Sequence, residues 1–505
     1  MNRAAFGCVV AGALLAALTC RLAGLDLRPM HHDEANQAVK FGTLLESGDY
    51  RYDRDEHHGP TLYYLTLPMA WVRGQTTLAS LDEHTLRAVP AVFGAALILL
   101  LVPLAAGLGR GAMAGAAVLT ALSPALTYYS RFYIQESLLA FFALGFVVLL
   151  GRYLQRPGVA AACGAGAFAG LAFATKETAL IVLPAALAAA IVAQRATRPP
   201  GPTARPWARH GCAAVATAVG IAVVLYSSFF RHPRGVLESV LALSTYAGRG
   251  IAVGPHTQPW NYYLGVLSYS RSGGLVWSEG LVLVLAACGL AATVRRSDAG
   301  FWPRYVALYS VLVLVAYSAI GYKTPWNLLP FYVGLVVLAG YGAAAMMGAA
   351  RSRTVRTAVA LALMAAACQL GAQNWRANFG YPADTRNPYV YAQTSSDLLR
   401  LTRRITALAA VHPDRDRMLI KVIADPHQQW PLPWYLRRMT RVGYWTRAQD
   451  AGPLADAPVI VASQENADQV GAAVGDQDVS EFYGLRPDIL LTLYVDRALW
   501  ARLVK

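Results

Sequence analysis

The chain has few charged residues for its length. Of its 505 residues, 14% are Asp, Glu, Lys or Arg and 56% are hydrophobic, whereas a soluble globular protein carries roughly 25% charged residues. This shortage excludes an ordinary soluble domain as the bulk of the chain and indicates that most of it is solvated by lipid. The formal net charge of +15 does not indicate nucleic-acid binding, because the arginines fall mainly between apolar runs, as in cytoplasmic loops.

Cysteine is also scarce. All six cysteines lie inside apolar runs, so the outer loops carry no disulfide framework. None has the C-x-x-C spacing of a zinc site. The sequence contains no internal repeat and no low-complexity tail. The first apolar run lacks an A-x-A-like cleavage site, so we expect it to be a retained membrane anchor.

Eleven apolar runs approach the ~20 residues needed to cross a bilayer. They cover residues 4–25, 87–107, 112–129, 137–151, 158–174, 178–194, 211–230, 275–294, 304–320, 325–347 and 357–374. With the N-terminus inside the cell, the arginines between these runs fall on the inner side at every turn. The sequence therefore predicts an all-α polytopic protein of the cytoplasmic membrane, with about 11 transmembrane helices and a cytoplasmic N-terminus.

After the last apolar run the composition becomes polar and mixed. Strand-like runs at 418–424, 458–462 and 489–495 alternate with helix-like runs at 396–409 and 465–473. This alternation predicts a small extracytoplasmic α/β domain. We therefore divide the chain into a transmembrane domain of residues 1–374, whose first outer loop covers 26–86, and an α/β domain of residues 375–505.

Two adjacent carboxylates stand just beyond the first span. Asp33 and Glu34 precede an amphipathic helix predicted over residues 35–46, whose apolar stripe can lie on the bilayer. A carboxylate at the point where a membrane-bound substrate arrives suits a general base. The alternative is that Asp33 only caps the helix and that the helix dipole favours Glu34.

The same outer loop is rich in histidine. Imidazole and carboxylate groups could hold a divalent cation, and the candidate ligands are His31, His32, Glu56, His57 and His58. No metal-binding spacing is recognisable among them. A metal site and an ordinary polar loop therefore both stay open.

Charge recurs at three later outer turns. Arg131 and Glu136 flank one turn, Lys176 and Glu177 form the next, and Lys323 lies in the last. Charges at membrane depth are unfavourable unless they have a function, and the cations suit a phosphate at the level of the lipid headgroups. Snorkelling or a local Lys176–Glu177 ion pair is the alternative.

These features resemble the GT-C superfamily of integral-membrane glycosyltransferases. The likeness is greatest to the protein O-mannosyltransferase and aminoarabinose transferase branch and its bacterial and archaeal relatives. It rests on Arg28–Ala35, Ser130–Glu136 and Ala174–Glu177, and covers residues 4–350. The resemblance implies a polyprenyl-phosphate sugar donor and an inverting reaction. It also implies an acidic base or metal ligand in the first outer loop, which corresponds to Asp33, with Glu34 beside it.

The expected function is transfer of a sugar to a lipid, glycan or protein acceptor at the outer membrane face. Asp33 would remove the acceptor proton, and the donor phosphate would be bound by Arg131, Lys176 and Lys323, with Glu136 and Glu177 as supporting acids. We expect Asp33, Glu136, Lys176 and Lys323 to face one cavity.

Two alternatives come from other functional classes. One is a flippase of lipid-linked oligosaccharides or its accessory protein. The other is a sensor whose output lies in residues 375–505. The lack of charged residues in the span centres and of an inverted repeat argues against a transporter.

Overall fold

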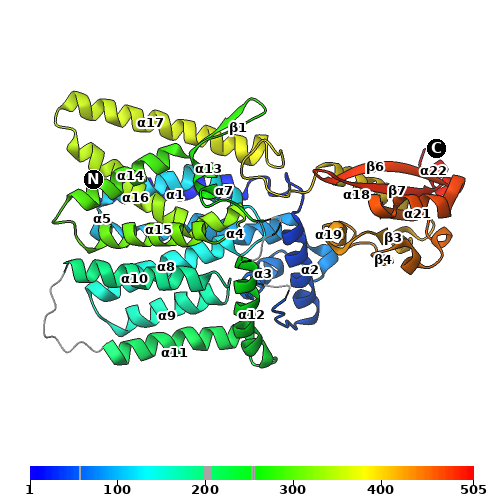
Figure 1. The fold of residues 1–505 in the computed structure, drawn as a ribbon, viewed down its shortest axis with the longest axis horizontal. Helices are drawn as coiled ribbons and strands as arrows, with labels where there is room; N and C mark the ends of the chain where they lie inside the picture. Colours follow the sequence, from blue (N-terminus) through cyan, green and yellow to red (C-terminus); the bar gives the residue numbers. More distant parts are fainter. Residues whose placement is uncertain (56–57, 198–206, 252–253, 255, 505) are drawn as a thin grey trace.

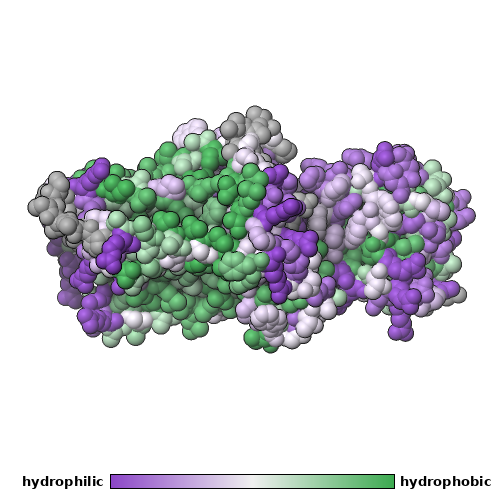
Figure 2. Space-filling view, turned by 90° about the horizontal axis from the view of Figure 1, so that it is seen from below, coloured by the Kyte–Doolittle hydropathy of each residue, from purple (hydrophilic) through white to green (hydrophobic). Residues whose placement is uncertain are grey.

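The computed structural model describes residues 1–55, 58–197, 207–251, 254 and 256–504. The molecule is elongated, with a helical bundle at one end and a small α/β domain at the other (Figure 1). The N-terminus lies at the end of the bundle farthest from the α/β domain. Figure 2 shows an apolar band across the visible face of the bundle, with hydrophilic surface on either side of it.

Within these residues, eight helices are long and apolar enough to cross a membrane. They are α1 (Arg3–Leu22), α4 (Glu83–Leu101), α8 (Glu136–Gln155), α10 (Ala179–Thr197), α11 (Trp207–Tyr226), α15 (Phe301–Ala319), α16 (Leu329–Ala349, preceded by η2, Pro325–Leu328) and α17 (Arg353–Trp375). The pair α6 (Arg110–Leu122) and α7 (Pro124–Ser130) is bent by 57°, and α9 (Val159–Phe173) and α14 (Gly280–Arg295) are shorter apolar helices. Each predicted span coincides with one of these elements, which confirms the polytopic helical prediction.

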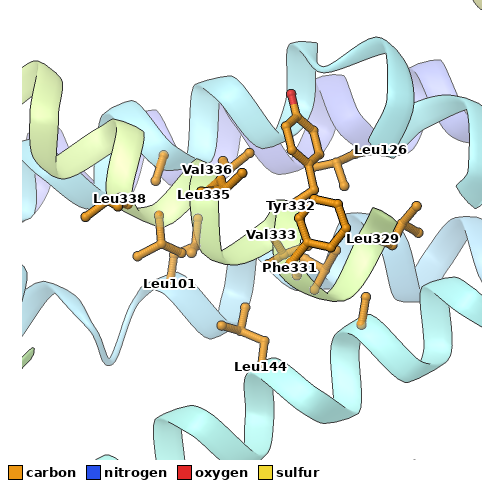
Figure 3. Close-up of a cluster of buried hydrophobic side chains, with 14 of the residues drawn as sticks. Leu101, Leu126, Leu144, Leu329, Phe331, Tyr332, Val333, Leu335, Val336 and Leu338 are labelled. Atoms are coloured by element: carbon orange, nitrogen blue, oxygen red, sulfur yellow. The ribbon is translucent and has the colours of Figure 1, made fainter. Parts of the chain in front are cut away.

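The centre of the bundle is α16. It is apolar around its whole circumference, as expected of a helix enclosed by others, and its buried side chains include Leu329, Phe331 and Val336 (Figure 3). Gly340 allows α16 to approach α6 closely, because a Cβ there would lie 2.3 Å from the carbonyl oxygen of Ala112. Small residues at such crossings are typical of membrane helix pairs.

The segments between the spans form a layer between the bundle and the α/β domain (Figure 1). This layer contains α2 (His32–Ser47), α3 (Thr61–Val72) and α12 (Arg234–Ile251), while α13 (Tyr262–Ser268) and the hairpin of β1 (Ser270–Ser272) and β2 (Leu275–Trp277) lie at the same end of the bundle, near α7 (Figure 1). The apolar stripe predicted for α2 exists, but its Ala35 and Ala38 are fully buried inside the protein. The prediction that this stripe lies on the bilayer was wrong, because α3 and the α/β domain cover it.

The α/β domain contains a five-stranded mixed sheet with the order β4-β3-β5-β7-β6. The strands are β3 (Ile420–Ile423), β4 (Val442–Trp445), β5 (Val459–Ser463), β6 (Asp478–Arg486) and β7 (Ile489–Asp496). The domain's helices are α18 (Asp397–Val411), α19 (Pro426–Gln429), α20 (Leu432–Tyr435), α21 (Gln464–Val474) and α22 (Arg497–Leu503). The predicted strands correspond to β3, β5 and β7, and the predicted helices to α18 and α21, which confirms the small α/β domain.

The two layers of this domain follow from the alternation of β5. Val459 and Val461 pack in the core shared with α18 and α22, whereas Ile460 and Ala462 pack in the core shared with α21. Successive side chains of a strand point to opposite faces, so β5, which is buried along its whole length, has helices covering both of its faces.

Glu34 joins the first outer loop to the bundle. It is fully buried and binds Arg87 of α4 through both carboxylate oxygens, each 2.7 Å from a guanidinium nitrogen. The backbone N–H of Tyr133 donates to the same carboxylate at 2.8 Å. Burial alone would raise the pKa of Glu34, but Arg87 and Arg28 outweigh it and lower this pKa to about 2. Every strong contact of its carboxylate is inside the protein, and these contacts support a structural role for Glu34 in place of the expected catalytic one.

We expect Glu34→Gln to destabilise the protein, because it leaves the Arg87 guanidinium buried without a counter-charge. Breaking a buried pair in this way typically costs about 3–5 kcal/mol. Chemical denaturation in a mild detergent measures the difference from wild type. Asp26→Asn is the control, since Asp26 lies in the same loop with 61% of its side chain exposed. Wild-type stability of Glu34→Gln with loss of activity would instead return Glu34 to the catalytic residues.

Candidate functional site

A cavity of about 1230 Å³ lies where the bundle, the α/β domain and the layer between them meet. Its polar lining comes from the start of α2, the segments before α3 and α13, the start of α8, the turn between α9 and α10, the segment before α16, and the part of the chain after α17. These side chains include His31, His32, Asp33, His58, Glu136, Lys176, Glu177, His256, Asn327, Tyr391, His427 and Arg486. On the bundle side the wall is apolar, with Leu180, Ile181 and Ile320.

Asp33 lies in the first turn of α2 with its carboxylate in this cavity. The helix is capped by His31, whose Nδ1 accepts from the backbone N–H of Asp33 at 3.1 Å, and Glu34 completes the capping box. The alternative that Asp33 caps α2 was therefore wrong. Its side chain is 44% exposed, and in the described part of the chain its carboxylate accepts no hydrogen bond.

His31 fixes the orientation of this turn. Its Nε2 lies 3.1 Å from the carbonyl oxygen of Tyr391, and its ring packs edge-on against Trp326. Since Nδ1 already accepts a hydrogen bond, this contact assigns the proton to Nε2. Burial lowers the pKa of His31, so the ring is neutral near pH 7. Both ring nitrogens are therefore occupied by backbone groups.

Lys176 is the cation on the opposite, bundle side of the lining. It forms an ion pair with Glu136 and donates to Asn327 Oδ1 at 3.1 Å, and it is 6% exposed. The alternative of a local Lys176–Glu177 pair was wrong, because Glu177 instead accepts from His58 Nδ1 at 2.8 Å. A buried lysine facing a cavity with one carboxylate partner can also bind an incoming anion.

Lys323 is not at this cavity. Its neighbours Tyr322 and Thr324 line the wall, but the Lys323 ammonium donates to the carbonyl oxygens of Ile320 and Gln258. The expected convergence is thus found for Asp33, Glu136 and Lys176 and not for Lys323. The carbonyls at the C-terminal end of α15 attract this cation, as helix C-termini do.

Arg131 is also placed elsewhere. Its guanidinium donates to the carbonyl oxygens of Cys20, Ala23 and Gly24 at 2.6–2.8 Å, at the end of α1. The last carbonyl oxygens of a helix lack hydrogen-bond donors within the helix, and the Arg131 guanidinium provides such donors at the end of α1. These contacts support a capping role for Arg131 in place of the expected binding of the donor phosphate.

The proposed metal ligands do not assemble in the described residues. Glu56 and His57 lie outside them. His31 uses both nitrogens on the backbone, and His58 is paired with Glu177. The ring of His32 stacks on that of His427, and burial lowers its pKa to about 4. Within the described part of the chain, no group of three or more His, Cys, Asp or Glu side chains could hold a metal ion, so we derive no step through one.

Several lining residues come from the C-terminal part of the chain, and the sequence interpretation did not anticipate them. Tyr391 follows α17, His427 lies in α19, and Arg486 ends β6. These positions carry no local motif. Only the tertiary fold brings them to the first outer loop.

Sequence comparison matches residues 66–227 to the family of dolichyl-phosphate-mannose-protein mannosyltransferases. This range includes Glu136 and Lys176 but not Asp33. A search of curated protein sequences found no match.

Comparison with solved structures covers nearly the whole chain. ArnT from Cupriavidus metallidurans, bound to undecaprenyl phosphate, is similar with a TM-score of 0.64 and 15% identity over 99% of each chain. The oligosaccharyltransferase AglB from Archaeoglobus fulgidus, in complex with an inhibitory peptide and a dolichol-phosphate, is similar with a TM-score of 0.58 and 12% identity over 98% of this chain and 77% of that one. The mycobacterial arabinofuranosyltransferase AftD has a TM-score of 0.52 and 14% identity over 98% of this chain and 40% of that one.

The fold is therefore that of the GT-C glycosyltransferases. The resemblance predicted from the sequence is confirmed at the level of the fold, and residues 66–227 match a family of mannosyltransferases. The structural likeness extends beyond residue 350, since it includes the α/β domain.

The capping role of Arg131 is testable. We expect Arg131→Met to lower the stability of the protein, because charge-assisted hydrogen bonds are typically worth ~1.5–3 kcal/mol each, and to leave the affinity for polyprenyl phosphate unchanged. Thermal unfolding and a polyprenyl-phosphate titration measure the two effects. A variant with wild-type stability and weakened lipid binding would restore Arg131 to the phosphate site.

Proposed function

We propose that this protein transfers a sugar from a polyprenyl-phosphate donor to an acceptor at the outer face of the cytoplasmic membrane, with inversion at the anomeric carbon. The observation that carries the proposal is that the Asp33 carboxylate lies in the cavity without a strong partner. Of the cavity carboxylates, Glu136 and Glu177 are engaged with Lys176 and His58, whereas Asp33 is half exposed beside the neutral His31. Among the described residues that line the cavity, Asp33 is therefore the carboxylate available to accept a proton.

The proposed reaction breaks the bond between the anomeric carbon and the donor phosphate. The acceptor hydroxyl oxygen attacks this carbon from the opposite side and loses its proton to Asp33. Polyprenyl phosphate leaves with the bonding electrons, and Lys176 stabilises its charge. The apolar wall of Leu180, Ile181 and Ile320 offers a path for the polyprenyl chain from the bilayer.

The proposed orientation places the cavity and the α/β domain outside the cytoplasm. Arginines cluster at the bundle end that carries the N-terminus, as in the loop from Arg295 to Arg304 and the loop from Arg351 to Arg356. Positive loops stay on the cytoplasmic side. The α/β domain lies at the other end of the bundle (Figure 1).

The direct test is incubation of the purified protein with polyprenyl-phosphate sugars and measurement of released polyprenyl phosphate. We expect Asp33→Asn to lower this turnover by about 10²- to 10⁴-fold, the usual contribution of a general base, with folding and lipid binding retained. Asp26→Asn is the matched control outside the cavity. Near-normal turnover of Asp33→Asn would remove Asp33 from the mechanism. If labelled lipid crosses the bilayer while the wild type transfers no sugar, the flippase alternative replaces the enzyme.

Lys176→Met tests the phosphate contact. Hydrogen bonds to charged groups are typically worth ~1.5–3 kcal/mol, so we expect the efficiency of transfer from the donor to fall roughly 10- to 150-fold. This change also leaves Glu136 without its cation.

The double variant Lys176→Met/Glu136→Gln separates the two effects, because it removes both charges of the pair. We expect a donor titration to show the lower transfer efficiency in Lys176→Met and in the double variant, but not in Glu136→Gln alone. A double variant with wild-type donor affinity would mean that Lys176 only neutralises Glu136.

A further inference from the structure

The α/β domain contributes a cation to the cavity at the end of β6. The pairing of β6 with β7 shifts register between Gly484 and Arg486. Leu485, at this irregularity, is fully buried in the domain core, and Arg486 lines the cavity. Such bulges redirect side chains and are common beside functional sites.

The Arg486 guanidinium has donors left over. It donates to the carbonyl oxygen of His427, while its Nε is buried and has no partner within the described residues. Burial lowers the pKa of Arg486, and the charge of Asp33 acts in the opposite direction. His427, which accepts from Arg486, stacks its ring on that of His32, the residue before Asp33, so Arg486 lines the cavity on the side of Asp33 with unused hydrogen-bonding capacity.

The position beside Asp33 decides which reactant Arg486 faces. In an inverting transfer the base and the nucleophile lie on the face of the sugar opposite the leaving group. Lys176 is held on the bundle side by Glu136 and Asn327, next to the apolar wall that suits the donor lipid. A guanidinium beside the base therefore faces the acceptor and not the leaving phosphate.

We propose that Arg486 binds an anionic group of the acceptor, a phosphate or a carboxylate, and so positions the acceptor hydroxyl at Asp33. This proposal rests on the proposed transferase function and assigns part of the acceptor site to the α/β domain. A planar guanidinium pairs with either anion through two parallel hydrogen bonds. Arg486 is a specificity residue in this account and takes no part in the proton transfer.

The test is a binding comparison on the full-length protein saturated with polyprenyl phosphate, so that soluble anions cannot occupy the donor phosphate site. The probes are glucose 1-phosphate, glucuronate and the neutral methyl glucoside. We expect one or both anions to bind more tightly than the neutral sugar. Arg486→Gln should weaken anion binding roughly 10- to 150-fold, while Arg486→Lys retains part of it. Arg447→Gln is the control, because Arg447 lies in the same domain, pairs with Asp450 and is 64% exposed.

Preference for one probe would identify phosphate or carboxylate as the recognised group. Equal binding of anions and neutral sugar, or an anion preference that survives Arg486→Gln, would overturn the proposal. A loss of polyprenyl-phosphate affinity in Arg486→Gln would also overturn it and move Arg486 to the donor side. This binding comparison does not require turnover. Failure of the wild-type protein to transfer sugar would therefore contradict the proposed function without deciding the role of Arg486.

Discussion

The buried ion pair between Glu34 and Arg87 is the contact on which the geometry of the cavity depends. Arg87 also donates to the carbonyl oxygens of Leu25 and Arg28, so one guanidinium fixes the chain on both sides of the turn that leads from α1 to α2. An unpaired charge in this position would be strongly destabilising. The pair therefore sets the position of α2 relative to the bundle, and with it the direction of Asp33.

The C-terminal part of the chain holds this turn from the other side. Gln393 donates to the carbonyl oxygen of Pro29 and Thr394 to that of Met30, at 2.9 and 2.7 Å, and the backbone N–H of Met30 donates to the Tyr435 hydroxyl at 2.8 Å. The segment before Asp33 is thus enclosed by residues 364 to 405 positions later in the sequence. These hydrogen bonds hold the α/β domain against the membrane bundle. The cavity is therefore formed by residues of both parts.

The sequence predicts the parts of this structure that depend on local chemistry. The spans could be found because lipid requires long apolar runs, and β3, β5 and β7 because they are apolar and continuous. The strands β4 and β6 were missed, since β4 has four residues including Gly443 and β6 is a polar edge strand. The roles of Asp33 and Glu34 could not be separated from the sequence, because Arg87 decides which of them is buried. Arg131, Lys323 and Arg486 show the same limit, since their partners are distant carbonyls or a cavity formed only in three dimensions.

The central claim is that the cavity containing Asp33 and Lys176 binds the phosphate of a polyprenyl-phosphate donor. A cryo-EM structure of the full-length protein with bound polyprenyl phosphate tests it most directly. The account predicts a phosphate oxygen within about 2.7–2.9 Å of Lys176 Nζ, the distance of a charge-assisted hydrogen bond, with the polyprenyl chain along Leu180 and Ile181. A phosphate bound outside this cavity, with Lys176 still paired only to Glu136 and Asn327, would contradict it.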